Sequence, residues 1–211
     1  MDKSSTNSQA SLFKPEYEHM LLDKGELRYY EAWLSQDEAQ QLFINLRQSI
    51  EWEQSVINMY GRAVKIPRLN AWYGDDNCPY RYSGHQFFAK PWLTELLTIK
   101  QRIESVGSLT FNSVLANCYR SGQDSVAWHS DDEPELGKNP VVACLSLGAE
   151  RQFQLRHRYQ KQLPVQKLTL KTGSLLIMSG AIQHYWHHQV PKTAKKVGER
   201  LSLTYRQVKS I

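Results

Sequence analysis

The sequence has few cysteines and no long apolar run. Three cysteines, Cys78, Cys118 and Cys144, lie far apart and in no metal-ligand spacing. This pattern argues against a disulfide framework and predicts free thiols in a reducing compartment. No stretch approaches membrane-spanning length, and the polar residues 1–10 lack the apolar core of a signal peptide. We therefore expect no membrane partner and a cytoplasmic location, either the bacterial cytosol or, in a eukaryote, the nucleus.

No internal repeat is evident, and the size of the chain predicts a single domain. With 211 residues, 41% of them hydrophobic, the chain can bury a full core. Residues 1–16 are rich in Ser, Asn and Gln, so we expect a disordered or loosely attached lead, followed by one domain over residues 17–211 that acts as a monomer. The net charge of +5 suits a polyanionic partner, although many basic proteins bind nothing acidic.

Strand-like segments dominate the second half of the chain, whereas helical patterns are confined to the first. Ser35 and Glu38 form a capping-box signature that opens a helix ending near Ile50, and a second helix is expected over about residues 91–106. Short strands at high density suggest a jelly-roll or related barrel with helices outside it, a mainly β fold. The predicted strands are Phe111–Tyr119, Val141–Leu147, Gln152–Arg156, Leu168–Leu170, Ser174–Met178 and Leu201–Tyr205.

The short stretch Trp128–Glu133 carries a metal-ligand pattern. His129 and Asp131 are two residues apart, so in an extended segment both side chains leave the same face and can reach one ion. An imidazole and a carboxylate, completed by a second imidazole, form the facial triad of non-heme Fe(II) oxygenases. The pair alone is a weak signal, because turns with several acidic residues are common at protein surfaces.

The third ligand has to come from His184, His187 or His188. Strand alternation places His184 and His188 on one face and His187 on the other, so the spacing narrows the choice without settling it. The downstream pattern favours His188, because the next strand, residues 200–206, alternates polar and apolar side chains.

That strand has two interpretations. Arg200, Ser202, Thr204 and Arg206 share one face, which could simply be solvated. Alternatively, the two arginines clamp a dicarboxylate, because guanidinium groups bind carboxylates in a forked geometry and stay charged in a pocket. Asn117 and Tyr119 also share a face, and they would line a ligand pocket if that face points into the barrel.

A hairpin and a loop-rich stretch rich in aromatics and arginine occupy residues 51–84. The sequence Tyr60-Gly61-Arg62 marks the turn of a hairpin. Tyr60 either folds back onto the core or acts as an exposed probe. The following stretch, through Tyr80-Arg81-Tyr82, suits stacking on bases and contact with phosphates, and equally suits an ordinary polar rim.

Taken together and in order, these motifs resemble the AlkB family of Fe(II)- and 2-oxoglutarate-dependent dioxygenases, in the nucleic-acid repair branch similar to animal AlkB homologues 2 and 3. The resemblance covers roughly residues 50–208. The motifs that carry it are Pro67-Arg68, Asn117-Cys118-Tyr119, His129-Ser130-Asp131, Gly173-Ser174-Leu175-Leu176, His188 and the Arg200–Arg206 strand.

The resemblance implies a double-stranded β-helix that oxidises N-alkyl groups on bases such as 1-methyladenine and 3-methylcytosine in DNA. The cofactor would be Fe(II), with 2-oxoglutarate and O2 converted to succinate and CO2. The partner would be alkylated DNA, single- or double-stranded. A related enzyme acting on RNA or protein is the alternative, and a binding module without metal is disfavoured by the intact ligand set.

The resemblance also implies a role for each matching residue. Fe(II) would be bound by His129, Asp131 and His188, and 2-oxoglutarate by Asn117, Tyr119, Arg200, Thr204 and Arg206, with Ser202 where the family more often has Asn. Asp132 and Glu133 would sit at the lesion pocket, and Arg68 would position the strand or Asp132. The substrate strand would meet Tyr80, Arg81 and Tyr82, while Tyr60, Gly61 and Arg62 match a hairpin whose wedge residue is Phe in duplex-acting relatives.

Overall fold

Two antiparallel β-sheets form the body of the computed structural model, which describes residues 16–59, 61–76, 78, 80–82, 85–87 and 89–209. The strands are β1 (Glu18–Leu22), β2 (Gly25–Tyr30), β3 (Val56–Met59), β4 (Arg62–Lys65), β5 (Leu69–Gly74), β6 (Tyr80–Tyr82), β7 (His85–Phe87), β8 (Ser113–Tyr119), β9 (Val126–His129), β10 (Val142–Gly148), β11 (Arg151–His157), β12 (Gln166–Leu170), β13 (Leu175–Gly180), β14 (Trp186–Val190) and β15 (Arg200–Arg206). The helices are α1 (Gln36–Ser49), α2 (Thr94–Glu104) and α3 (Ile182–Tyr185), with a 3-10 turn at Pro134–Leu136.

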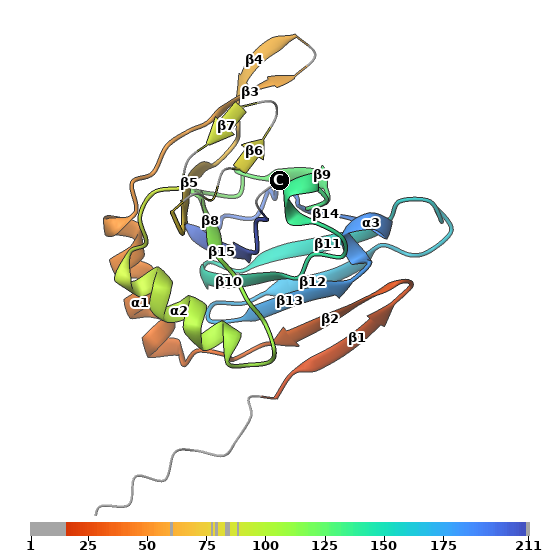
Figure 1. Cartoon of the computed structure of the whole chain (residues 1–211), viewed down its shortest axis with the longest axis horizontal. Coiled ribbons are helices and arrows are strands. Elements are labelled where there is room, and N and C mark those ends of the chain that lie inside the picture. Colours follow the sequence, from red (N-terminus) through yellow and green to blue (C-terminus); the bar gives the residue numbers. More distant parts are fainter. Residues whose placement is uncertain are drawn as a thin grey trace, which may run out of the picture.

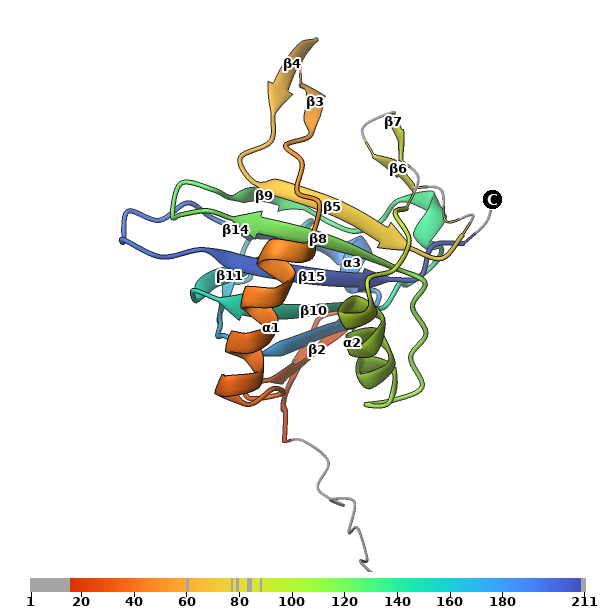
Figure 2. The ribbon, with the colours of Figure 1, turned by 90° about the vertical axis from the view of Figure 1, so that its left-hand side faces the viewer.

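The larger sheet has the strand order β1-β2-β13-β10-β15-β8-β5 and the smaller one β12-β11-β14-β9. Figures 1 and 2 show α1 and α2 lying against one side of the larger sheet, away from the smaller sheet. The expected mainly β architecture with outer helices is therefore confirmed, and its two packed antiparallel sheets correspond to the jelly-roll core that the strand pattern predicted.

The two faces of the larger sheet belong to two different cores. Residues such as Leu201, Leu203 and Tyr205 of β15 pack against α1 and α2. The space between the sheets holds a second cluster that includes Tyr119 and Phe153. Because side chains alternate along a strand, the residues of β15 between the leucines point into the space between the sheets.

Helix α1 begins where its capping signature predicts. The Ser35 hydroxyl accepts a hydrogen bond from the backbone N–H of Glu38 at 3.2 Å, which satisfies one of the free N–H groups of the first turn. The Glu38 carboxylate forms an ion pair with Arg102 of α2. The two helices therefore share a charged contact in addition to packing in the same apolar cluster.

Several elements differ from the sequence-based expectation. Helix α2 begins at Thr94 and not near Pro91, and β5 occupies part of the stretch predicted to be loop-rich. Ile182–Tyr185 is a short helix, so treating His184 and His188 as residues of one strand was wrong. The expected lead over residues 1–16 lies, except for Glu16, outside the described residues.

The hairpin of β3 and β4 projects from the body on the side of β5 and β9 (Figures 1 and 2). Its strands pair in register from Val56–Lys65 to Met59–Arg62, and every residue of β4 is exposed. Gly61 at the turn has φ 75°, a backbone conformation that favours glycine. The predicted hairpin is confirmed, whereas Tyr60 itself lies outside the described residues.

Candidate metal and co-substrate site

His129, Asp131 and His188 converge at the edge of the smaller sheet. His129 ends β9 and lies opposite His188 of β14 in the strand register, with their ring centroids 4.2 Å apart. Asp131 follows β9 by two residues, and its Oδ2 lies 3.6 Å from His188 Nε2. One potential ligand atom from each residue falls within a group no wider than 4.8 Å, which is compact enough for one metal ion.

The hydrogen bonds of His129 leave one ring nitrogen available. Its Nδ1 lies 2.8 Å from the carbonyl oxygen of Ala127, which fixes the tautomer with the proton on Nδ1 and leaves the Nε2 lone pair for an ion. His188 is buried, and burial together with nearby His129 lowers its pKa to about 3. His188 therefore presents the neutral imidazole that binds metals, and His129 offers its Nε2.

Asp131 is buried but charged. Burial by itself raises its pKa, but Arg206, His188 and His129 outweigh that effect and bring the pKa below its ordinary value. Arg206 Nη2 donates to Asp131 Oδ1 at 2.6 Å, leaving Oδ2 on the side of His188. The Arg206 guanidinium thus orients the carboxylate toward the cluster.

Arg200 is a buried cation whose hydrogen bonding is incomplete. Only 1% of its surface is exposed, its Nη2 donates to Ser146 Oγ at 2.9 Å, and its guanidinium lies 5.2 Å from the centre of the Tyr119 ring. Its Nε and Nη1 atoms have no hydrogen-bond partner within the described part of the chain. Burying an incompletely bonded guanidinium is costly, and an incoming carboxylate would complete its bonding.

Two adjoining hollows meet at the cluster and share Arg68, Asn117, His129, Asp131 and Arg206. The first extends between the sheets and is also lined by Tyr119, His188, Arg200, Ser202 and Thr204. The second opens toward the hairpin side and is lined by Ser55, Asn70, Trp72, Ser130 and Glu133. The solvent-face interpretation of β15 is therefore wrong, because its polar residues line an interior hollow.

Arg68 connects the two hollows. Its Nε donates to Asn117 Oδ1 at 2.8 Å and its Nη1 to the carbonyl oxygen of Ser125 at 3.3 Å. Asp132, which the sequence offered as an alternative partner of Arg68, instead accepts from Arg158 Nη1 at 2.6 Å. Arg68 therefore orients Asn117 and the chain before β9, and Arg158 holds Asp132.

Only some of the residues predicted to contact the substrate lie within the described part of the structure. Arg62 is exposed at the start of β4, and Glu133 lines the hollow on the hairpin side. Tyr80, Arg81 and Tyr82 form strand β6, but their side chains lie outside the described residues. His184, the third histidine considered, accepts from the backbone N–H of Asn139 at 3.3 Å and is not in the cluster.

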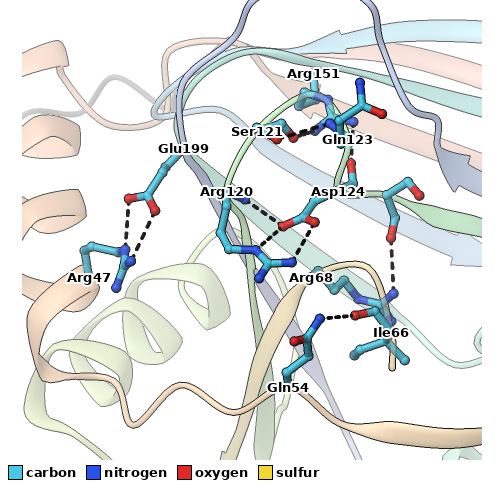
Figure 3. A network of polar contacts seen from close by, with 11 residues as sticks. Arg47, Gln54, Ile66, Arg68, Arg120, Ser121, Gln123, Asp124, Arg151 and Glu199 are labelled. Carbon is cyan, nitrogen blue, oxygen red and sulfur yellow. Dashed lines mark hydrogen bonds and ion pairs between the residues drawn. The ribbon is translucent and has the colours of Figure 1, made fainter. Parts of the chain in front are cut away.

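Sequence reasoning missed two buried residues that support the site. Gln183 bonds to the backbone of Asp131. Arg151 donates to the carbonyl oxygens of Ser121 and Asp124 (Figure 3) and lies 5.6 Å from the centre of the Tyr119 ring. Such long-range contacts leave no local signal in the sequence.

The residues present fit an iron and 2-oxoglutarate site. Two imidazoles and one carboxylate form the donor set of a facial triad with open positions. The Nε and Nη1 atoms of Arg200, which lack a partner among the described residues, belong to a side chain of the same hollow. There they can receive the far carboxylate of a short dicarboxylate.

Sequence comparison identifies the family to which a chain with this site belongs. The model of the 2OG-Fe(II) oxygenase superfamily matches residues 26–206. The chain is 41% identical over 190 residues to the alpha-ketoglutarate-dependent dioxygenase alkB homolog 3 of Rattus norvegicus, covering 85% of this chain and 63% of that protein. It is 31% identical over 210 residues to the DNA oxidative demethylase ALKBH2 of Mus musculus, covering 95% of this chain and 87% of that protein.

Solved structures show the same fold at lower identity. The structure of OsALKBH1 aligns with a TM-score of 0.60 and 18% identity over 90% of this chain and 100% of that chain. A prolyl hydroxylase from Trichoplax adhaerens aligns with a TM-score of 0.59 and 15% identity over 86% of this chain and 83% of that chain. None of the helices in the described ranges has the length and apolarity to cross a membrane.

Proposed function

The chain belongs to the 2OG-Fe(II) oxygenase superfamily and, within it, to the AlkB family, and from this premise we propose that it removes N-alkyl groups from DNA bases such as 1-methyladenine and 3-methylcytosine. The family uses Fe(II), with 2-oxoglutarate and O2 as co-substrates. The chain spans 63% of the length of the rat homolog 3 that it matches, and its activity on DNA is therefore a proposal.

One observation carries the proposal: the compact cluster of His129, Asp131 and His188 shares a hollow with the incompletely bonded guanidinium of Arg200. A cluster alone would suit many metals. The buried Arg200 guanidinium in the same hollow has N–H groups without a partner among the described residues, and these favour an anionic organic co-substrate. The match to relatives named as oxidative demethylases then supports N-alkylated bases as the class of substrate.

In this proposal each residue of the inner hollow has one task. His129, Asp131 and His188 hold Fe(II), while Arg200, with Asn117 and Tyr119, receives the far carboxylate of 2-oxoglutarate. Arg206 orients Asp131 and, with Thr204 nearby, steadies the chelating end; Ser202 lines the wall beside Cys144, whose Sγ lies 3.1 Å from Ser202 Oγ. When bound, iron with 2-oxoglutarate and oxygen supplies the oxidant for the alkyl carbon.

The hollow on the hairpin side is the proposed chamber for the base. Trp72 gives it an apolar wall, and Arg68, Asn70 and Glu133 supply polar groups that can read the edge of a flipped base. Asp132, held by Arg158, lies in the chain between Asp131 and Glu133, which both line this hollow. A base must leave the stack to enter, at a cost that is smallest for a lesion unable to pair.

The surroundings support a nucleic-acid partner and a single-chain enzyme. Tyr60, Gly61 and Arg62 at the hairpin tip, with Tyr80, Arg81 and Tyr82 of the second hairpin, are proposed to contact the DNA strand. All ligands and co-substrate residues come from one chain, which suits a monomer. The cysteines Cys78, Cys118 and Cys144 are buried and free, which supports a reducing compartment, the cytosol or the nucleus.

The direct test is mass measurement on defined oligonucleotides. Purified protein with Fe(II), ascorbate and 2-oxoglutarate should lower the mass of single-stranded DNA carrying 1-methyladenine or 3-methylcytosine by one methylene per lesion. Asp131→Ala, which lacks the carboxylate ligand, is the matched control and should be inactive. Turnover confined to methylated RNA or to a peptide would redirect the proposal to the alternative substrate, and turnover on none of these would contradict it.

A further inference from the structure

Gln183 is a fully buried polar side chain beside the ligand cluster. It lies in the four-residue helix α3 and is 0% exposed. A buried carboxamide is costly unless its oxygen and nitrogen are hydrogen-bonded. Its partners therefore show what holds it there.

Both ends of the carboxamide have partners. Oε1 accepts from the backbone N–H of Asp131 at 3.0 Å, across 52 residues of sequence. Nε2 lies 3.8 Å from Met178 Sδ, a weak acceptor in the neighbouring strand β13. With Nε2 directed at Met178, the amide oxygen faces Asp131. The stronger of the two hydrogen bonds is therefore the one to the backbone of the proposed metal ligand.

The backbone at Asp131 needs such support. Strand β9 ends at His129 and the next element begins at Pro134, so no strand ladder fixes the residue between them. A buried N–H without a ladder partner has to be paired by a side chain or by water. Gln183 supplies that partner from a distant part of the sequence.

The adjacent residues are held to the same region. Arg158, which follows β11, binds the Asp132 carboxylate at 2.6 Å, and the same Nη1 lies 3.5 Å from Ser130 Oγ and 3.5 Å from the carbonyl oxygen of Gln183. The segment from Ser130 to Asp132 is thus held by α3 and by the end of β11 together.

We infer that Gln183 is a positioning residue that fixes the backbone of Asp131, so that one carboxylate oxygen meets Arg206 and the other faces the metal. The inference rests on the proposed role of Asp131 as a metal ligand. Gln183 touches neither substrate nor metal in this account. Its effect passes through the orientation of Asp131, as is common for residues that bond to metal ligands.

The test is binding of Co(II), a stand-in for Fe(II), by isothermal titration without co-substrate. Gln183→Met keeps the side-chain length and removes the acceptor, and it should weaken Co(II) binding by about 10- to 100-fold. Gln183→Glu keeps an acceptor oxygen at the same place and should bind within about 3-fold of the wild type or tighter. If Gln183→Met does not fold, Gln183→Asn takes its place. Its side chain is one methylene shorter, so its oxygen is withdrawn from Asp131, and the same loss of Co(II) affinity is expected.

Gln189→Met is the matched control. Gln189 lies one residue beyond His188 in β14 and bonds outward to Gln154 at 2.8 Å, so its loss should leave Co(II) binding unchanged. The inference is overturned if the Gln183 variants without an acceptor bind like the wild type, if Gln183→Glu is as weak as they are, or if Gln189→Met loses as much. Equal Co(II) binding by Asp131→Ala and wild type would instead overturn the proposed metal site itself.

Discussion

Polar and apolar side chains alternate along β15, and all of them except the partly exposed Thr204 are buried. Leu201, Leu203 and Tyr205 face the helices, while Arg200 and Arg206 face the space between the sheets. Placing two guanidinium groups in an interior is costly without anions. Arg206 meets Asp131 within the chain, and Arg200 is left to meet a co-substrate.

Arg200→Ala should therefore weaken 2-oxoglutarate binding by about 2 to 5 kcal/mol, because the far carboxylate would be buried without its charged partner. Calorimetric titration of 2-oxoglutarate in the presence of a redox-inert metal measures the loss. Arg102→Ala, which removes an arginine that pairs with Glu38 on the helical side, should leave the affinity unchanged. Equal affinities for wild type and Arg200→Ala would show that the clamp assignment is mistaken.

The ligand assignment makes a second prediction about neighbouring histidines. His188 points inward in β14 and His187 does not, as their burial pattern shows. His188→Ala, like His129→Ala and Asp131→Ala, should abolish turnover and bound iron, since three ligands are near the minimum for holding Fe(II). His187→Ala should retain iron. Iron analysis of the purified variants decides, and retention by His188→Ala with loss by His187→Ala would reverse the assignment.

The loop between β8 and β9 is closed by Asp124 (Figure 3), which accepts from the backbone N, Nε and Nη2 of Arg120 at 2.9, 2.7 and 2.9 Å. Burial by itself raises the pKa of Asp124, but the bonds from Arg120 outweigh it and leave the pKa below its ordinary value. A carboxylate whose pKa is lowered by folding stabilises the native state above its unfolded pKa, near about 3.9. That stability is lost as the pH falls through the lower folded value.

Asp124→Asn should accordingly lower the free energy of unfolding by about 1.5 to 3 kcal/mol near pH 7, the range for hydrogen bonds to a charged group. The difference from the wild type should shrink as the pH falls below about 4, because the carboxylate of the unfolded chain then protonates before the native one does. Urea unfolding of both proteins at several pH values gives the comparison. A difference that stays constant down to the lowest pH would mean that the charge of Asp124 is not what stabilises the loop.

The hairpin of β3 and β4 gives the prediction that concerns duplex DNA. If Tyr60 at its tip fills the gap left by a flipped base, Tyr60→Ala should slow repair of double-stranded substrate by about 5- to 150-fold, since base–aromatic stacking is worth roughly 1 to 3 kcal/mol. Single-stranded repair should stay nearly unchanged, because a single strand has no gap to fill. The ratio of duplex to single-strand turnover, at one salt concentration, is the measurement. An unchanged ratio would exclude the wedge, and equal losses on both substrates with a lower melting temperature would favour a buried tyrosine.

The sequence predicts well the elements whose hydrophobic residues recur with a single clear period. Strands β8, β10 and β15 lie in the larger sheet, and their runs of leucine, valine and alternating apolar residues predict strands directly. Strand β5 was missed because its buried residues, Ala71 to Gly74, occupy both faces and its flanks are rich in arginine and tyrosine. Helix α3 is four residues long, too short for a helical period, which is why His184 was placed on a strand.

The residues of the site also divide into those that a local sequence pattern predicts and those that it does not. The spacing of His129 and Asp131 predicts two ligands, and the choice of His188 rests on the strand that follows. No local pattern predicts that Gln183 meets Asp131 or that Arg158 meets Asp132, because these pairs are 52 and 26 residues apart. Contacts of this kind arise from the packing of the two sheets and can be seen only in the fold.

For the whole molecule, the net charge of +5 does not show which cations are available to a phosphate backbone. Arg158 is paired with Asp132, Lys171 with Glu31, and Arg156 lies 4.3 Å from the centre of the Trp128 ring. Other lysines and arginines near the proposed DNA path would still give binding a steep salt dependence. The net charge thus agrees with a nucleic-acid partner. The proposed oxidative chemistry rests instead on the hollow at His129, Asp131 and His188.

We propose that one site couples 2-oxoglutarate consumption to loss of an alkyl group from DNA. The measurement that tests it most directly counts succinate, formaldehyde and repaired base in one reaction containing Fe(II), 2-oxoglutarate and a singly methylated oligonucleotide. The three products should form in equal amounts, and succinate should fall to background when the oligonucleotide is unmethylated. Succinate formed at the same rate with or without the methyl group, and with no formaldehyde, would contradict it.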